Sequence, residues 1–189
     1  AGLRSFNRYS PFPEEVNRRL ITSMATYHFP PTEAAAKQLI QEGIPEANIC
    51  QTGNTVIDAL YMLLEQSADY DWSLFDDSRR LLLVTAHRRE NHGKPLHNIC
   101  RALKEIVQTH EDVEIAFPVH LNPNVQQVVR HQLEGIPRIH LLPPVPYDVF
   151  VHLMKRAYLI LTDSGGVQEE APALGKPVLV LRRETERAE

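Results

Sequence analysis

A polar turn between two apolar runs near the end of the sequence has the residue types of a nucleotide site. It reads Asp163-Ser164-Gly165-Gly166, and Glu169 and Glu170 follow one helical turn later. Small residues at a helix start let backbone N–H groups approach a phosphate, and a nearby carboxylate can accept hydrogen bonds from sugar hydroxyls. Ser and Gly are also ordinary helix-start residues. The turn alone is therefore equally compatible with a capped connection that binds no ligand.

Two histidines stand where two earlier apolar runs end. His87 follows Thr85 and precedes Arg88, and His120 follows Pro118. An imidazole titrates near neutrality and can carry a proton or donate to a phosphate, and a guanidinium can hold an anion. Each segment alone is better explained as a solvated turn or a helix-capping loop. Because the carboxyl ends of parallel strands share one sheet edge, the three polar segments together predict a phosphate or sugar site.

Glu14 and Glu15 open a predicted helix directly after Pro13. They are spaced four residues from Arg18 and Arg19, so surface ion pairs and the helix dipole explain both carboxylates adequately. Their spacing alone makes neither one catalytic.

The elements that must position these residues alternate regularly from about residue 80 onward. Short continuous apolar runs are typical of parallel strands that are covered on both faces, and helical patterns separate them. The pattern predicts an α/β fold with a Rossmann-like, doubly wound parallel sheet. We expect strands over Leu81–Thr85, Val113–Phe117, Ile139–Leu142, Tyr158–Leu161 and Pro177–Leu181, and helices over Leu96–Thr109, Pro123–Leu133, Tyr147–Arg156 and Gly166–Leu174.

The first part of the chain is organised differently. Short strands are expected over 27–29 and 48–51, helices over Thr32–Glu42 and Val56–Gln66, and a linker-like polar stretch over 67–79. A net charge of −4 argues against nucleic acid as a partner. Two distant cysteines predict buried free thiols in a reducing compartment, and no apolar stretch is long enough to span a membrane. The expected location is the cytoplasm.

Five blocks, in order along nearly the whole chain, closely resemble the non-hydrolysing UDP-N-acetylglucosamine 2-epimerases. They are Ser10-Pro-Phe-Pro-Glu14-Glu15-x-Asn17-Arg18, Gly53-Asn54-Thr55, His87-Arg-Arg-Glu90-Asn91, Pro118-Val-His120-x-Asn122-Pro123 and the Asp163 turn with its Gln168-Glu169-Glu170. The resemblance implies GT-B architecture, with two Rossmann-like domains and the active site between them. Residues 1–53 would be the tail of the N-terminal domain and 54–189 most of the C-terminal one. We expect an internal fragment that is inactive alone.

The resemblance also implies the reaction and the catalytic residues. The family inverts C2 of UDP-N-acetylglucosamine to give UDP-N-acetylmannosamine, by eliminating UDP to a 2-acetamidoglucal and adding it back, in the service of polysaccharide biosynthesis. Glu14 corresponds to one of the catalytic acids. His87 corresponds to the histidine that contacts the diphosphate and aids departure of UDP.

The remaining roles follow from the same resemblance. Ser164, Gly165 and Gly166 match the phosphate-binding turn, Glu170 the residue that holds the ribose hydroxyls, and Phe150 the segment that flanks the uracil. Arg88 and His120 fall where bacterial members bind a second, activating UDP-N-acetylglucosamine. No cofactor or metal is expected, and the full-length protein is expected to be a homodimer.

Two other functions remain compatible with the same turn. A GT-B glycosyltransferase would use the Asp163 turn and Glu170 to hold a nucleotide sugar, but it needs an acceptor site where this sequence carries the acidic Glu14 block. A non-catalytic nucleotide-sugar sensor would bind the same ligand without turning it over.

Overall fold

The computed structural model describes residues 4, 7–9, 12–66 and 70–182, and the chain divides between Ala59 and Leu60 into two compact units. The division lies inside helix α3 (Thr55–Leu64), whereas the predicted boundary precedes that helix. The assignment of the two parts to two domains of a larger protein remains a prediction. Positions 10 and 11 of the first block, and 67–69 of the expected linker, lie outside the described residues.

The first unit contains α1 (Glu14–Met24), α2 (Glu33–Gln41), the short η1 (Glu46–Asn48) and the start of α3. Thr32 caps α2, because its hydroxyl accepts a hydrogen bond from the backbone N of Ala35 at 3.2 Å. The two short strands expected here are reduced to a single parallel bridge between His28 and Ile49.

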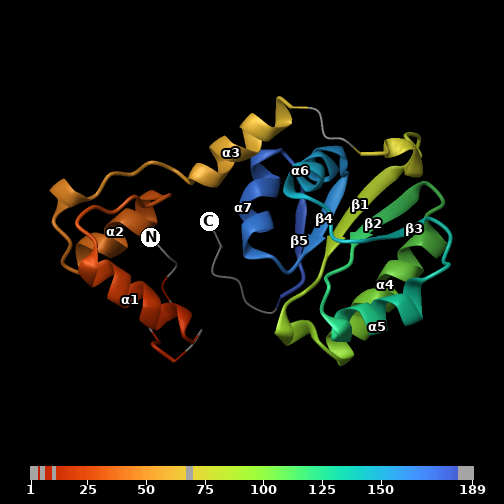
Figure 1. Cartoon of the computed structure of the whole chain (residues 1–189), viewed down its shortest axis with the longest axis horizontal. Helices are drawn as coiled ribbons and strands as arrows, with labels where there is room; N and C mark the ends of the chain where they lie inside the picture. The colour runs from red at the N-terminus through yellow and green to blue at the C-terminus, as the bar shows by residue number, and fades with distance from the viewer. Residues whose placement is uncertain (1–3, 5–6, 10–11, 67–69, 183–189) are drawn as a thin grey trace. The chain divides into compact units, whose positions relative to one another are not determined.

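The second unit is built on a five-stranded, fully parallel sheet with the order β3-β2-β1-β4-β5 (Figure 1). The strands are β1 (Arg80–Thr85), β2 (Val113–Pro118), β3 (Ile139–Leu142), β4 (Leu159–Thr162) and β5 (Val178–Val180). The chain crosses from β3, at one edge, to β4 on the other side of β1. This change of direction is the switch point at which open α/β sheets leave a crevice.

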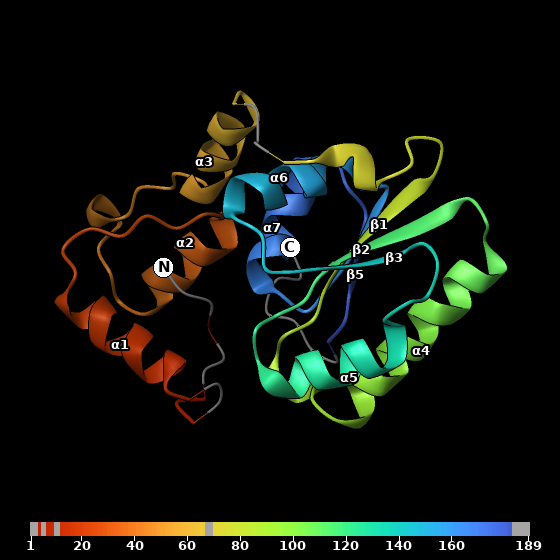
Figure 2. The ribbon, with the colours of Figure 1, turned by 45° about the vertical axis from the view of Figure 1, so that its right-hand side comes forward.

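Helices cover both faces of the sheet. Helices α4 (Lys94–Thr109) and α5 (Pro123–Leu133) lie on one face, and α6 (Tyr147–Arg156) and α7 (Gly165–Ala173) lie on the other (Figures 1 and 2). Side chains of β1 alternate between two buried cores: Leu82 and Val84 pack with the α4–α5 layer, and Leu81 and Leu83 with the α6–α7 layer. The predicted doubly wound fold is confirmed, with each predicted strand and helix of this unit within two residues of its observed bounds.

The segment before β1 is not a loose linker in its described part. Phe75 is buried in the α6–α7 core. Tyr70 and Trp72, the first residue of the short η2 (Trp72–Leu74), pack against that core. The buried carboxylate of Glu114 accepts a hydrogen bond from the backbone N of Asp76 at 3.1 Å and holds this segment to β2. The linker interpretation is therefore wrong here, because aromatic side chains spaced along a polar stretch supply an apolar face.

Arg138, just before β3, has left-handed backbone geometry with φ at 68°. Its guanidinium donates to the carbonyl oxygens of His110 at 2.6 Å, Val113 at 3.0 Å and Val107. Val107 is in the last turn of α4 and His110 is its C-cap, so a cation satisfies carbonyls that lack helical partners. These charge-assisted bonds offset the strained backbone.

The cysteines are free, as expected, but only one is buried. Cys100 lies inside α4, where burial raises the pKa of its thiol to about 11. Cys50 is exposed in the first unit, so the expectation of two buried thiols is wrong for that residue. Across the described ranges, none of the helices combines the length and the hydrophobicity needed to cross a bilayer.

Candidate functional site

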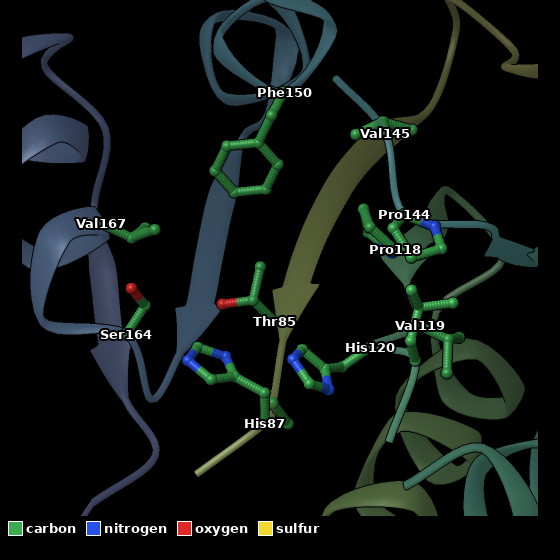
Figure 3. Close-up of a pocket in the computed structure, with 12 residues that line it drawn as sticks. Thr85, His87, Pro118, Val119, His120, Pro144, Val145, Phe150, Ser164 and Val167 are labelled. Carbon is green, nitrogen blue, oxygen red and sulfur yellow. The ribbon is translucent and has the colours of Figure 1, made fainter. Parts of the chain in front are cut away.

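A cavity of about 360 Å³ opens at the carboxyl edge of the sheet, where β1, β2 and β4 end (Figure 3). The loops after these strands, the start of α6 and the start of α7 all reach it. The lining consists of Thr85, Ala86, His87, Pro118, Val119, His120, Leu121, Pro144, Val145, Phe150, Ser164 and Val167. A mostly apolar wall with a few convergent polar groups is typical of a small-molecule site.

Asp163 is fully buried directly after β4 and fixes the loop that follows β1. Its Oδ2 accepts hydrogen bonds from the backbone N of His87 at 2.9 Å, the backbone N of Arg88 at 2.8 Å and Nδ2 of Asn91 at 2.8 Å. Asn91, in the short η3 (Arg89–Asn91), also donates to the backbone O of Leu181 at 2.9 Å, just beyond β5. Asp163 and Asn91 together thus tie the ends of β1, β4 and β5.

His87 presents its ring to the cavity while its Nδ1 lies 3.2 Å from Oδ1 of Asp163. Partial burial is the main influence on this imidazole and lowers its pKa. The charge of Asp163 raises the pKa, and His120 and Arg88 lower it further. The net shift is downward, so the His87 ring is neutral at pH 7.

His120 comes from the loop after β2 and stacks on His87, with ring centroids 5.5 Å apart and an angle of 21° between the rings (Figure 3). Its Nδ1 accepts a hydrogen bond from the backbone N of Asn122 at 3.1 Å. Asn122 caps α5, because its Oδ1 accepts a hydrogen bond from the backbone N of Asn124 at 3.0 Å. The capping loop therefore turns the His120 ring toward the cavity.

Two threonine hydroxyls form a short chain beneath the cavity. Thr85 and Thr162 are register partners on β1 and β4, with their oxygens 2.5 Å apart. Thr162 is completely buried and accepts a hydrogen bond from the backbone N of Ser164 at 2.9 Å, and either threonine hydroxyl can donate to the other. Thr85 is the member of this pair that lines the cavity.

The turn at the start of α7 has room for an anion. Ser164 lines the cavity, and its side chain makes no capping bond to the helix. A Cβ added at Gly166 would meet only Oγ of Ser164, at 4.0 Å, and the backbone of Gly166 is not left-handed. Neither packing nor conformation within the chain requires glycine there. Free space above helical N–H groups is what a bound phosphate needs.

Glu170 is a buried residue further along α7, and its Oε1 accepts a hydrogen bond from the hydroxyl of Tyr147 at 2.9 Å. Partial burial, followed by this bond, raises the pKa of Tyr147 to about 12. The phenol therefore remains a donor at physiological pH. It holds one carboxylate oxygen of Glu170 and leaves the other for a ligand.

In the first unit, Glu14 and Glu15 at the start of α1 differ in burial and in ion pairing. Glu15 is buried and forms ion pairs with Arg18 at 2.8 Å and Arg19 at 3.0 Å. Arg18 also contacts Glu42 at 3.1 Å. The expected ion pair between Glu14 and Arg18 is therefore wrong, because the i,i+3 geometry brings Glu15 to Arg18 instead. Glu14 is exposed.

The cavity unites only part of the predicted site. His87, His120, Phe150 and Ser164 line it, while Gly165 and Gly166 follow directly in the chain, and Arg88 and Glu170 lie outside the lining. Glu14 belongs to the other unit. The roles assigned to all of these residues stay predictions.

Sequence reasoning missed three contributors. The sequence presents Asp163 only as part of a turn, although a lone acid directly after an apolar run is a signal for a buried, functional carboxylate. The Thr85 hydroxyl and Tyr147 carry no such signal, since their relevance depends on contacts with residues 77 and 23 positions away. Within the described ranges, no group of three or more His, Cys, Asp or Glu side chains is arranged to hold a metal ion.

Comparison with known proteins extends over every residue of the chain. A family model described as UDP-N-acetylglucosamine 2-epimerase matches residues 1–189. The probable UDP-N-acetylglucosamine 2-epimerase of Ralstonia solanacearum is 51% identical over 100% of the chain, which corresponds to 53% of that protein. The chain thus spans about half the length of the curated relatives it matches.

Solved structures of related proteins support the same family assignment. The UDP-GlcNAc 2-epimerase of Neisseria meningitidis bound to UDP-GlcNAc aligns with a TM-score of 0.89 and 45% identity, over 99% of this chain and 53% of that one. The Staphylococcus aureus MnaA–UDP structure aligns with a TM-score of 0.91 and 46% identity, over 99% and 51%. The GT-B fold class predicted from the sequence is confirmed. By sequence and by fold alike, this chain belongs to the UDP-N-acetylglucosamine 2-epimerase family.

Proposed function

We propose that the complete protein interconverts UDP-N-acetylglucosamine and UDP-N-acetylmannosamine, and that residues 54–189 supply most of its UDP-binding domain. The observation that carries the proposal is the cavity at the switch point, where the predicted residues His87, Phe150 and Ser164 meet. Because the family model matches the whole chain, the ligand proposed for that cavity is a UDP-sugar. Relatives have been crystallised with UDP-GlcNAc and with UDP, and the ligand assignment is carried over from them.

The reaction requires a proton to leave C2 and the bond from C1 to the diphosphate oxygen to break. The electron pair of the C2–H bond forms the C1–C2 double bond, and the C1–O pair departs with UDP. Return of UDP to C1 and of a proton to the opposite face of C2 completes the inversion. Glu14 acts as a general acid–base at the sugar, and His87 stabilises the departing diphosphate.

The nucleotide is held by the second unit. The turn from Ser164 to Gly166 binds the phosphates through backbone N–H groups, and the free space at Gly166 supports this role. Glu170 accepts hydrogen bonds from the ribose hydroxyls through the oxygen that Tyr147 leaves free. Phe150 flanks the uracil from the α6 side of the cavity.

Arg88 and His120 are proposed to contact a second, activating UDP-N-acetylglucosamine. The stacking of His120 on His87 supports a direct route for such an effect, because a ligand that moves one ring moves the other. The proposal also includes a homodimer in the cytoplasm. Free cysteines fit a reducing compartment.

Gly166→Ala should weaken UDP binding by about tenfold or more while leaving the fold intact, because the added methyl occupies the space proposed for phosphate. Alanine is favoured over glycine inside a helix by roughly 0.5–1 kcal/mol, so stability should hold or rise. Titration calorimetry with UDP and thermal unfolding, both on the complete protein, measure the two effects. Unchanged UDP affinity would remove the phosphate assignment of this turn.

The activity itself is tested by incubating the complete protein with UDP-N-acetylglucosamine in deuterium oxide, without NAD or metal. We expect UDP-N-acetylmannosamine that carries deuterium at C2, detected by NMR and mass spectrometry. Transfer of the sugar to an acceptor would favour a glycosyltransferase. Binding without turnover would favour a sensor, and product with no solvent deuterium at C2 would exclude the proton-abstraction route.

A further inference from the structure

The buried carboxylate of Asp163 presents its two oxygens to the His87 loop in different ways. Three N–H donors converge on Oδ2, at 2.8–2.9 Å. Oδ1 is also buried, and the described residues supply no backbone or amide donor to it, while the ring Nδ1 of His87 lies 3.2 Å away. A buried carboxylate oxygen needs a donor. The Nδ1–Oδ1 contact is close but not aligned as a hydrogen bond, and the imidazole can supply the missing donor only by carrying its hydrogen on Nδ1.

The neighbouring imidazole has the opposite arrangement. Nδ1 of His120 accepts the backbone N–H of Asn122 at 3.1 Å, so its hydrogen is on Nε2. The two stacked rings therefore differ in tautomer. His87 is left with an unprotonated Nε2 as the ring nitrogen available to the cavity that it lines.

We propose that Asp163 is a positioning residue, which fixes the Nδ1 hydrogen of His87 so that Nε2 takes up a proton when a diphosphate binds in the cavity. This inference rests on the proposed function for its ligand. A neutral Nε2 lone pair repels a phosphate oxygen, whereas an imidazolium donates to it and keeps its other N–H on Asp163. Binding of the substrate would thus draw a proton from solvent onto the group that stabilises the leaving UDP.

The charges around His87 fit this sequence of events. Asp163 faces it from the loop after β4, His120 from the loop after β2, and Arg88 adjoins it in the chain. Burial, His120 and Arg88 keep the imidazole neutral, against the charge of Asp163. A bound diphosphate adds negative charge on the side opposite Asp163 and favours the cation.

Asp163→Asn separates this role from simple packing. The three donors at Oδ2 require an oxygen there, so the new amide must turn its NH₂ toward Nδ1 of His87. The tautomer is then reversed in a side chain of unchanged shape. An Asp-to-Asn change beside a catalytic histidine has this effect in the serine-protease triad.

Glu114→Gln is the matched control. Glu114 is also a buried carboxylate that accepts a backbone N–H and faces a histidine, with Nε2 of His140 at 3.2 Å, but it lies near the start of β2, away from the cavity lining. A generic cost of altering a buried carboxylate–histidine contact would appear in both variants.

The experiment uses the ¹⁵N-labelled complete protein, with His87 assigned from the signal lost in His87→Asn. Long-range ¹H–¹⁵N spectra should place the hydrogen on Nδ1 in wild type and in Glu114→Gln, and on Nε2 in Asp163→Asn. Calorimetry of UDP binding in buffers of different ionisation enthalpy, at about pH 7.5, should report uptake of about one proton. Asp163→Asn should abolish that uptake and lower kcat by about 10²–10³-fold, with a smaller change in KM.

A wild-type His87 that carries its hydrogen on Nε2, or UDP binding without proton uptake, would overturn the inference even if Asp163→Asn fails to fold. Equal losses of kcat in Asp163→Asn and Glu114→Gln would also overturn it. Failure of the proposed function looks different: wild type would then lack epimerase activity while the tautomer of His87 remained as stated.

Discussion

Glu14→Gln should reduce kcat of the complete protein by about 10²–10⁴-fold, with KM changed far less, because general acid–base groups contribute on that scale. The substitution keeps the size and hydrogen-bonding reach of the side chain and removes only its ability to exchange a proton. Stability should barely change, since Glu14 is exposed at the first turn of α1 and Arg18 pairs with Glu15 instead. Steady-state epimerisation and thermal unfolding measure both quantities.

Glu15→Gln provides the matched control one residue away. Glu15 is buried between Arg18 and Arg19, so loss of its charge leaves two guanidinium groups undercompensated and should lower the unfolding temperature. Its kcat, measured well below that temperature, should stay near wild type. Turnover near wild type in Glu14→Gln would mean that Glu14 is only a solvated helix-start residue.

Glu170→Ala should weaken UDP binding by about 10²-fold or more. Two ribose hydroxyls are proposed to donate to this carboxylate, and hydrogen bonds to charged groups contribute about 1.5–3 kcal/mol each, with 1.4 kcal/mol per tenfold of affinity. The fold should survive, because Tyr147, the partner left behind, is 41% exposed and can donate to water instead. Titration calorimetry with UDP gives the affinity directly.

Tyr147→Phe separates the contribution of the Glu170 carboxylate to UDP binding from that of the Tyr147 hydroxyl that holds it. It removes the donor to Oε1 and leaves the charge of Glu170 in place, so UDP affinity should fall less than tenfold. Unchanged UDP affinity in Glu170→Ala would contradict the ribose assignment. An equal, large loss in both variants would mean that Tyr147 itself contacts the nucleotide.

The sheet and its helices could be predicted because their signals are local. Each strand of the second unit is a short apolar run, as in Leu81–Val84. Because parallel strands are buried on both faces, such a run is enough to predict the strand from the sequence. The short strands expected near His28 were less predictable, since a single bridge depends on distant backbone rather than on side-chain pattern. The stretch before β1 was wrongly predicted as a linker, although here the deciding signal does lie in its side chains. Its polar residues outnumber Tyr70, Trp72 and Phe75, yet these three decide where it packs.

The candidate site was predictable where chemistry follows a strand end. His87, His120 and Ser164 stand directly after apolar runs, and the fold brings them to one cavity. What spacing could not reveal is which partner each polar group takes. Glu15 rather than Glu14 forms an ion pair with Arg18, and the carboxylate of Asp163 accepts hydrogen bonds from the His87 loop. Such choices depend on burial and side-chain direction, which emerge only when the elements are packed together.

Among the described residues, the guanidinium of Arg138 bonds only to main-chain carbonyls, and this has an evolutionary consequence. A salt bridge between two side chains can drift, because a change in one can be answered by a change in the other. Every residue type offers the same carbonyl at Val107, His110 and Val113, so no substitution at those positions can compensate for the loss of Arg138. The contact therefore produces no pair of co-varying residues. Methods that infer proximity from co-variation would miss this set of hydrogen bonds, which holds α4 to the sheet.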